Sequence, residues 1–457
     1  MPARTIEHGG KWVVAAWREL SLDAKVVAAL GGANVLLLVA NHTTVQVTTD
    51  APLWALFPGF SGIAWLILCG LLVLAYPLRD RRSASGLSTR QRVLHLAAIV
   101  VAMVVIPTIA SIVLRETGKP YTYVHDGAIM IEEAARKLLR GQNPYVADYL
   151  DTPLYYWPMV NNPALYHLTY FPFLYLITVP FVWAFDNLRL FWDQRYLYLP
   201  AYLATLVIVP LLVRAPREKL ALTALVALNP QLFPFVIEGR NDFFVLAFLF
   251  GGVALLQRDR RTLGVLAISV AAAAKLHALF LLPFVAVYLV ARDRPRTLRE
   301  AWTAIWRAWW PGVAFTAITF VPFLVNDFPA FYDDVVRYNA GGAAWSYPIS
   351  GMGFSALLLA FGAIPNRQAD FPFAAIEIAV AAPIATYWLW RLWRDRRLGT
   401  MLLGYAITLL AFLFFGRYFQ GNYLGYILAV ASPVPFPRPI TRREPRVRRA
   451  IAVSAAK

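Results

Sequence analysis

Apolar runs of roughly 20 residues, long enough to cross the hydrocarbon core of a bilayer, recur along the whole chain. Of its 457 residues, 59% are hydrophobic and only 15% are charged. A soluble protein carries charge on about a quarter of its residues, so this chain has too little charge to cover a surface in water. The sequence therefore predicts one all-α polytopic membrane domain.

The net charge of +17 does not indicate nucleic acid. The basic residues form short runs between apolar segments, as cytoplasmic loops and lipid head groups require. We therefore expect membrane lipids, and no nucleic acid, among the partners. The lone Cys69 excludes a disulfide framework and is typical of a buried, inert thiol. The first apolar run, residues 24–45, is too long for the core of a cleavable signal and is expected to remain as an anchor.

Charge also predicts the orientation. Basic residues precede the first run and flank the return loop between the second run (62–78) and the third (93–114). This pattern places the N-terminus in the cytoplasm and the polar stretch 115–167 outside the cell, in the plasma membrane. A cytoplasmic position for 115–167 is the alternative. The residues that carry the prediction are Arg4, Lys11, Arg18, Lys25, Arg79, Arg81, Arg82, Arg90 and Arg92.

The remaining apolar runs extend the bundle to roughly 11 to 13 spans. They cover residues 168–185, 196–213, 220–237, 243–256, 263–275, 279–291, 311–325, 354–364, 371–390, 401–415 and 423–432. Basic clusters at 258–261, 292–299 and 391–397 should be cytoplasmic. If every run crosses, residues 214–219 fall outside, against the charge rule, and run 354–364 has to re-enter the membrane. We expect a single membrane domain over 1–437 and a basic cytoplasmic tail over 438–457.

The external stretch contains the first candidate for chemistry. Apolar residues of segment 128–140 repeat at helical spacing, with charges on the other face, which predicts an amphipathic helix lying on the membrane surface. Asp126 precedes it and is a candidate general base, because transfer to an alcohol needs a group that removes the hydroxyl proton. The alternative is that Asp126 is the N-cap of the helix. His125 is a candidate to share a proton or bind substrate.

Other polar residues gather at loops predicted on the same face. Lys275 lies between two apolar arms, where a charge is costly unless it has a function, such as holding a lipid-linked phosphate; a lysine snorkelling at a helix end is the alternative. His277 and Arg240 are further candidates for the phosphate, and so is Arg417, unless it is an interfacial arginine. Candidates for substrate contact, which alternatively only flank spans or solvated loops, are Asn241, Asp242, Tyr338 and Asn422.

Several motifs together resemble the polytopic GT-C glycosyltransferases, and in particular glycosyltransferase family 87, the polyprenyl-phosphate-mannose-dependent mannosyltransferases. The motifs are HD at 125–126, EAARKLLRGQNPY at 133–145, NP at 229–230, GRND at 239–242, AAKLH at 273–277, LP at 282–283 and RYFQGNY at 417–423. The likeness covers residues 121–432. Two apolar runs before the family's usual first span, and the altered YWP (156–158) and FP (171–172), depart from the pattern and leave the acceptor pocket undefined.

The resemblance implies a GT-C-like bundle with a catalytic aspartate in the first large external loop, which maps onto Asp126. It also implies a polyprenyl-phosphate sugar donor, a lipid-linked or glycan acceptor, inversion at the sugar carbon, and no required metal or other cofactor. Arabinose is the rival to mannose. Two other functions remain open: a transporter or flippase for a lipid-linked sugar, which predicts inverted repeats, and a ligase that moves a preassembled glycan. No repeat is evident, which favours the transferase.

Overall fold

The computed structural model describes residues 15–40, 56–57, 59–82 and 87–436. Within them, seven helices are long and apolar enough to cross a membrane: Leu22–Val39, Phe60–Arg82, Thr89–Thr117, Arg195–Leu212, Leu276–Asp293, Leu298–Asn326 and Phe373–Asp395. Three shorter apolar helices are Asp242–Gln257, Arg261–Ala274 and Leu398–Phe414. These helices confirm the predicted all-α polytopic membrane protein. Arg4, Lys11 and the predicted tail lie outside the described residues.

Most of the helices follow one another closely, and the longest connection in the described part of the chain after residue 87 lies between residues 139 and 172. In chain order they are α2 (Leu22–Val26), α3 (Gly32–Val39), α4 (Phe60–Arg82), α5 (Thr89–Val100), α6 (Ile106–Thr117), α7 (Asp126–Leu139), α8 (Pro172–Asn187), α9 (Arg195–Ile208), α10 (Pro216–Ala227), α11 (Phe233–Glu238), α12 (Asp242–Gln257), α13 (Arg261–Ala274), α14 (Leu276–Leu279), α15 (Leu282–Asp293), α16 (Leu298–Asn326), α17 (Phe328–Tyr332), α18 (Tyr338–Ala340), α19 (Phe354–Ala360), α20 (Phe373–Asp395), α21 (Leu398–Phe414) and α22 (Gly421–Ala431). One π turn (Val27–Gly31) joins α2 to α3, and another (Val101–Val105) joins α5 to α6.

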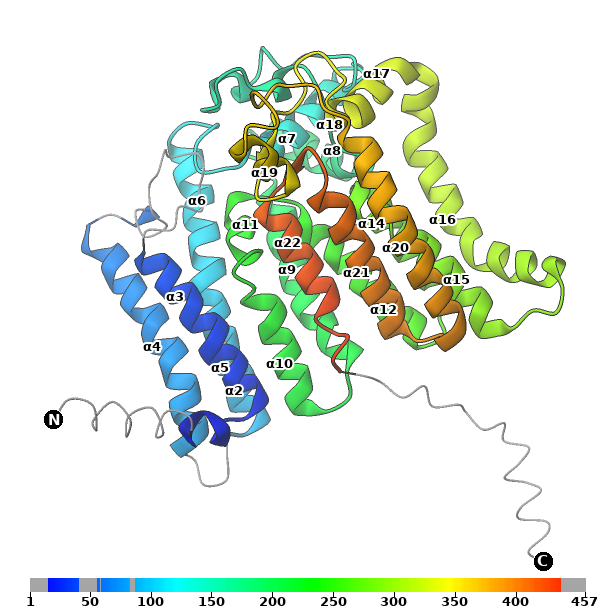
Figure 1. The fold of residues 1–457 in the computed structure, drawn as a ribbon. Coiled ribbons are helices and arrows are strands. Elements are labelled where there is room, and N and C mark those ends of the chain that lie inside the picture. The colour runs from blue at the N-terminus through cyan, green and yellow to red at the C-terminus, as the bar shows by residue number, and fades with distance from the viewer. Residues whose placement is uncertain (1–14, 41–55, 58, 83–86, 437–457) are drawn as a thin grey trace, which may run out of the picture.

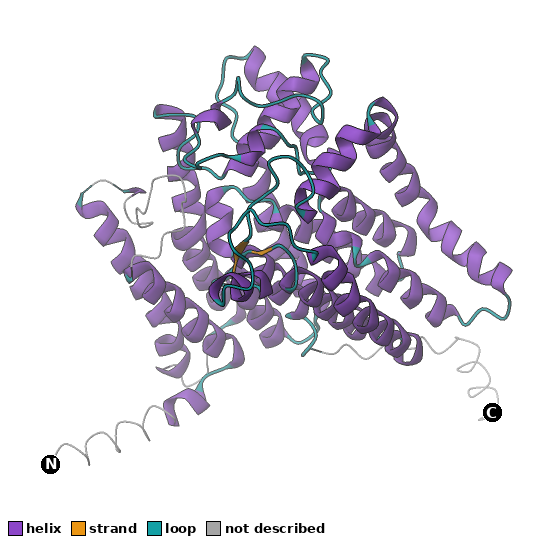
Figure 2. Ribbon diagram, turned by 45° about the horizontal axis from the view of Figure 1, so that its top comes forward, coloured by secondary structure: helices purple, strands orange, loops and turns teal. Residues whose placement is uncertain are grey.

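The bundle has two distinct ends. α7, α17, α18 and α19 gather at one of them, which we call the loop end (Figure 1). The basic clusters 79–82, 258–261, 292–299 and 391–397 follow or precede helices at the opposite end, which we call the basic end (Figure 1). At the loop end, β1 (Ser350–Gly351) and β2 (Tyr418–Phe419) form a parallel pair among the loops (Figure 2). It joins the segment before α19 to the segment before α22.

The apolar run 168–185 does not cross the bundle, so the condition that every run crosses is not met. It forms α8, which lies beside α7 at the loop end (Figure 1). Asp186, in its last turn, contacts Arg136 of α7 at 3.2 Å. The chain is still at the loop end at Asp193, which pairs with Arg115 at the end of α6 at 2.8 Å. One face of α8, with Leu174, Tyr175 and Val182, is buried by other helices, whereas Phe181 and Trp183 are exposed.

This placement resolves the conflict over residues 214–219. Because α8 stays at the loop end, α9 carries the chain to the basic end and α10 starts there (Figure 1). Residues 214–219 therefore join the other basic clusters, as the charge rule requires. The run 354–364 contains the short helix α19, which also stays at the loop end (Figure 1). Its Leu358 and Leu359 pack against a small cluster of Ile349, Ile364 and Phe373. The number of crossings in a bilayer stays a prediction.

The predicted amphipathic helix is present as α7, but its charged face is not turned to water or lipid head groups. Glu132, Glu133 and Lys137 are all buried. Glu132 pairs with Arg115 at 2.7 Å, and Lys137 pairs with Asp151 at 2.8 Å. Glu133 pairs with Arg136 of the same helix at 2.7 Å, so each of the three buried charges has an opposite charge beside it, which burial demands. The helix is a central element of the loop end and not a surface anchor.

Candidate functional site

Two adjoining pockets lie at the loop end, on either side of shared walls formed by His125, Gly127, Thr169, Tyr170, Arg240, Tyr418 and Tyr423. One, of about 150 Å³, is also lined by Asn241, Lys275, His277 and Asn422, and we call it the cation pocket. The other, of about 120 Å³, is also lined by Asp126, Trp157, Tyr338 and Tyr347, and we call it the Asp126 pocket. Nearly all of the predicted site residues therefore line one or the other of two neighbouring pockets.

Asp126 begins α7 and is not its N-cap. His125 occupies the cap position, and its Nδ1 accepts from the Gly127 N–H at 3.0 Å. Asp126 Oδ1 also accepts from Gly127 N–H, at 2.7 Å. Among the described residues no hydrogen bond reaches Asp126 Oδ2, so this oxygen keeps its lone pairs for a ligand. The alternative of a capping aspartate is wrong, because the preceding residue has the extended backbone that a cap needs.

The surroundings of Asp126 favour its ionised form. Burial alone would raise the pKa of the carboxyl, but His125, Arg240 and the Gly127 amide together hold it below its ordinary value. His125 Nδ1 is 2.7 Å from Asp126 Oδ1, a distance that requires a proton between them. When Nδ1 carries this proton, it donates to the carboxylate and no longer accepts from Gly127 N–H. Gly127 N–H then donates to Asp126 Oδ1 alone. His125 therefore orients the carboxylate.

Lys275 is placed by a break in the helical backbone. It is extended, with φ −154° and ψ 135°, between α13 and α14. Its Nζ donates to Asp242 Oδ1 at 2.5 Å and to Asn241 Oδ1 at 3.0 Å. Asp242 Oδ2 accepts in turn from Asn422 Nδ2 at 2.9 Å. Asp242 lines neither pocket, and its carboxylate holds the Lys275 ammonium in place.

Arg240 lies on the wall between the two pockets. Its Nε donates to Glu238 Oε2 at 2.9 Å and its Nη1 to Asn422 Oδ1 at 3.3 Å. Burial raises the pKa of Glu238, in spite of the opposing effect of Arg240 and His125.

His277 faces the cation pocket with an unused nitrogen. Its ring packs edge-on against Tyr423, with centroids 4.6 Å apart. Its Nδ1 is buried and has no hydrogen-bond partner among the described residues. A buried polar atom without a partner costs about 1–3 kcal/mol, so this nitrogen indicates a missing ligand or water.

Arg417 lies apart from the other predicted phosphate ligands. It is buried and lines neither pocket. Its Nε donates to the Tyr347 carbonyl at 2.6 Å and its Nη1 to the Ala369 carbonyl at 3.1 Å. Gly341, with φ +92°, lets the guanidinium pass, since a Cβ there would be 2.5 Å from Nη1. In this structure Arg417 fixes the loop that carries Tyr347.

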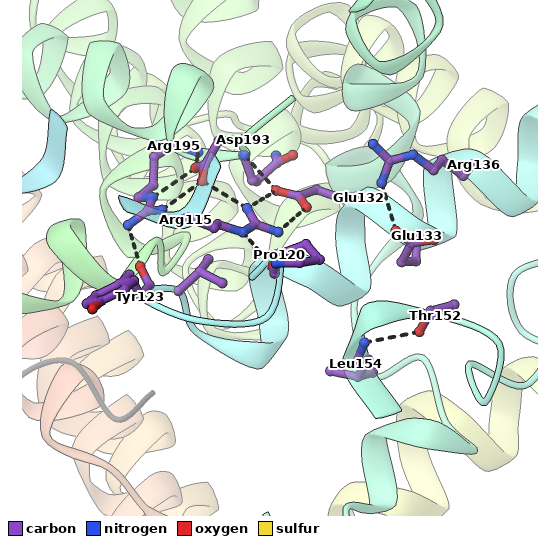
Figure 3. A network of polar contacts seen from close by, with 12 residues as sticks. Arg115, Pro120, Tyr123, Glu132, Glu133, Arg136, Thr152, Leu154, Asp193 and Arg195 are labelled. Atoms are coloured by element: carbon purple, nitrogen blue, oxygen red, sulfur yellow. Dashed lines mark hydrogen bonds and ion pairs between the residues drawn. The ribbon is translucent and has the colours of Figure 1, made fainter. Parts of the chain in front are cut away.

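A buried ionic network joins several of the elements that carry the site (Figure 3). Arg115 donates to both carboxylate oxygens of Glu132, at 2.9 and 2.7 Å, and to Asp193 at 2.8 Å. Gln194 N–H donates to Glu132 Oε1 at 2.8 Å. The network therefore joins α6, α7 and the start of α9.

Arg195 extends this network to the two loops of the site. Its Nε and Nη2 donate to Asp193 at 2.8 and 2.7 Å. Its Nη1 donates to the carbonyls of Tyr123, at 2.7 Å, and Ile237, at 2.8 Å (Figure 3). Because His125 N–H also donates to the Glu238 carbonyl at 2.8 Å, the loop before Asp126 is fixed to the loop before Arg240.

Several of these residues escape sequence reasoning. Tyr170 forms part of the shared pocket walls, but an isolated tyrosine near a span also fits an interfacial belt. Asp193 and Arg195 are an acidic and a basic residue two positions apart between two apolar runs, which resembles ordinary loop polarity. The one available signal is that charges so close to apolar runs need partners.

A model of glycosyltransferase family 87 matches residues 168–416, more than half of the chain. The matched segment contains Arg240, Asn241, Asp242, Lys275, His277 and Tyr338, and it begins after His125 and Asp126. No curated protein matches the chain. With an all-α membrane bundle and a polar double pocket at one end, the chain belongs to glycosyltransferase family 87 and is a membrane glycosyltransferase.

Proposed function

We propose that the protein moves a mannose unit from a polyprenyl-phosphate donor to a hydroxyl of a lipid-linked or glycan acceptor. The observation that carries the proposal is the double pocket: a free carboxylate oxygen on one side and cationic donors on the other, with Arg240 shared. A phosphate leaving group needs the cations and an acceptor hydroxyl needs the carboxylate. The two neighbouring pockets meet both requirements.

The donor phosphate is assigned to the cation pocket. Lys275 uses two N–H donors on Asn241 and Asp242, which leaves one for a ligand. Arg240 uses two of its donors on Glu238 and Asn422, which leaves others free. His277 can donate a further hydrogen bond to the phosphate when its Nδ1 carries a proton. These groups would stabilise the charge that develops on the phosphate as the bond to the sugar breaks.

The acceptor is assigned to the Asp126 pocket. Its hydroxyl oxygen attacks the anomeric carbon from the face opposite the phosphate, which inverts the configuration. The new carbon–oxygen bond forms while the bond to the phosphate oxygen breaks. Asp126 accepts the hydroxyl proton, and the polyprenyl phosphate leaves with the bonding electron pair. His125 keeps the carboxylate oriented through its 2.7 Å contact.

The proposed orientation places the loop end outside the plasma membrane. The basic clusters all lie at the other end (Figure 1), and cytoplasmic loops carry the excess of lysine and arginine. A polyprenyl-phosphate donor suits an external pocket because sugar nucleotides are cytoplasmic substrates. A transporter is less well supported, since the polar side chains gather at one end and not midway along the bundle.

Donor competition tests the proposal. The purified protein, in nanodiscs with an extract of its native lipids, is given polyprenyl-phosphate mannose, polyprenyl-phosphate arabinose or a mannose nucleotide, each radiolabelled. We expect label to appear in a new lipid or glycan product with polyprenyl-phosphate mannose. Transfer only from the arabinose donor would show that the donor sugar is arabinose and not mannose. Transfer only from the mannose nucleotide would refute the proposed donor class. Transmembrane movement of the donor without any product would favour the transporter.

A further inference from the structure

Two aromatic rings form an exposed stack at the loop end. Tyr166 and Trp345 have ring centroids 5.7 Å apart and an angle of 22° between their planes. Tyr166 is 42% exposed and Trp345 is 58% exposed. They come from loops far apart in sequence, one before α8 and one after α18. Exposing a stacked pair of large rings costs free energy relative to burial, and such surfaces commonly mark binding sites.

Neighbouring hydrogen bonds hold the stack rigid. His167, next to Tyr166, donates from Nε2 to the carbonyl of Ala344, next to Trp345, at 2.5 Å. His167 Nδ1 is 2.7 Å from Asp334 Oδ1. The Leu168 N–H donates to Asp334 Oδ2 at 2.8 Å. Both ring-bearing segments are thus fixed to each other by polar contacts that do not depend on the rings.

Trp345 also has an unfavourable backbone conformation. Its φ of 57° lies in the left-handed region, which bulky residues rarely occupy. Residues kept in such conformations cluster at functional sites, where the surrounding structure imposes them. Trp345 thus combines a left-handed backbone with an exposed large ring.

The two segments that carry the stack also line the Asp126 pocket. Ala164 and Tyr347 both line this pocket. Each is two residues from a ring of the stack, and two residues of extended chain span at most about 7 Å. That distance is comparable to the length of one sugar unit. A group bound at Asp126 and extended by a further sugar would therefore reach the rings.

We propose that Tyr166 and Trp345 form a saccharide-binding subsite for the part of the acceptor next to the hydroxyl that reacts, which identifies the acceptor as a glycan of more than one sugar. This inference rests on the proposed function for the position of the reacting hydroxyl. The C–H face of a pyranose or furanose ring is apolar and slightly positive, and the face of an aromatic ring is negative. The rings bear no charge, so they suit a neutral sugar chain better than an anionic head group.

Binding of soluble oligosaccharides tests the subsite without any transfer. Calorimetry on the protein in nanodiscs would compare linear mannose and arabinose oligomers of increasing length with Trp345→Ala, Tyr166→Ala and Trp345→Phe. For the wild type we expect affinity to rise from the single sugar to the longer oligomers of one series. Either alanine variant should lose roughly 3- to 10-fold of that gain, and Trp345→Phe should keep most of it. Phe361→Ala, at an exposed aromatic residue of the same end, is the matched control and should bind like the wild type.

The outcomes separate this inference from the proposed function. Length-dependent binding that requires Trp345, in a protein without polyprenyl-phosphate transfer, supports the subsite and contradicts the transferase proposal. Normal transfer with affinities that do not depend on oligomer length overturns the subsite alone. Unchanged binding in both alanine variants overturns it as well, and so does a lack of binding by both series. Donor affinity measured in the same variants should stay at the wild-type value.

Discussion

Replacing Arg195 by lysine tests whether the buried network positions the two loops of the site. The arginine makes four hydrogen bonds: two to Asp193 and one each to the carbonyls of Tyr123 and Ile237. A lysine keeps the charge but has a single nitrogen, which cannot reach the carboxylate and both carbonyls together. At least one buried carbonyl then loses its partner, at a cost of about 1–3 kcal/mol.

Hydrogen exchange measured by mass spectrometry localises this cost. The His125 N–H is bonded to the Glu238 carbonyl, so peptides covering 121–127 and 237–241 report on the junction. A loss of about 1–3 kcal/mol increases their exchange by roughly 5- to 150-fold. The rate of sugar transfer should fall, while the affinity for the donor, which is assigned to the pocket of Lys275, should change less. Arg261→Lys, at an ion pair of the basic end, is the control and should leave both peptides unchanged.

Unchanged exchange in both peptides of Arg195→Lys would refute the positioning role. A uniform increase over the whole chain would also refute it, because the network would then only stabilise the fold.

Three further predictions concern the donor, the topology and the loops. Lys275→Met should weaken binding of the donor by about 1.5–3 kcal/mol in affinity, whereas Lys219→Met should not; equal affinities would remove Lys275 from the site. A cysteine at Val160 should react with an impermeant reagent on intact cells and one at Leu298 only after permeabilisation, and the reverse pattern would invert the topology. Burial alone would lower the pKa of His167, but its hydrogen bonds to a carboxylate and a carbonyl raise it. The contact of protonated His167 therefore stabilises the loops fully below an ordinary histidine pKa of about 6.5, and this stabilisation is lost as the pH rises through the raised pKa. Hydrogen exchange of residues 164–170, corrected for the intrinsic rate, should increase over that pH range. In His167→Gln, the corrected exchange should no longer depend on pH.

The sequence predicts the class of fold and the residues around the pockets well, because both depend on local features. Apolar runs identify membrane helices directly, and a lysine such as Lys275 between apolar arms is too costly to be incidental. The path of the chain is less accessible. The run 168–185 is as apolar as a span because it packs against α7, α13 and α16, and hydropathy does not distinguish a protein interior from lipid.

Tertiary partners explain the other differences. The charged face of α7 predicts a helix at a water surface until Arg115 and Asp151 are known to lie against it. The capping preference favours aspartate over histidine, yet the backbone places His125 at the cap position. The carbonyls that Arg417 binds belong to residues about 50 and 70 positions earlier in the chain, and side-chain hydrogen bonds to such distant backbone groups leave no pattern in the sequence.

The central claim is that Asp126 removes the proton from the acceptor hydroxyl. The direct test measures transfer and donor binding by purified Asp126→Asn protein with polyprenyl-phosphate mannose, in the same nanodiscs as the wild type. Asparagine keeps the shape of the side chain and, with His125 still at the cap position, the start of α7 should fold normally. We expect unchanged donor affinity and a transfer rate lower by roughly 10² or more, because an amide cannot accept the proton. Near-normal turnover in this variant would falsify the assignment.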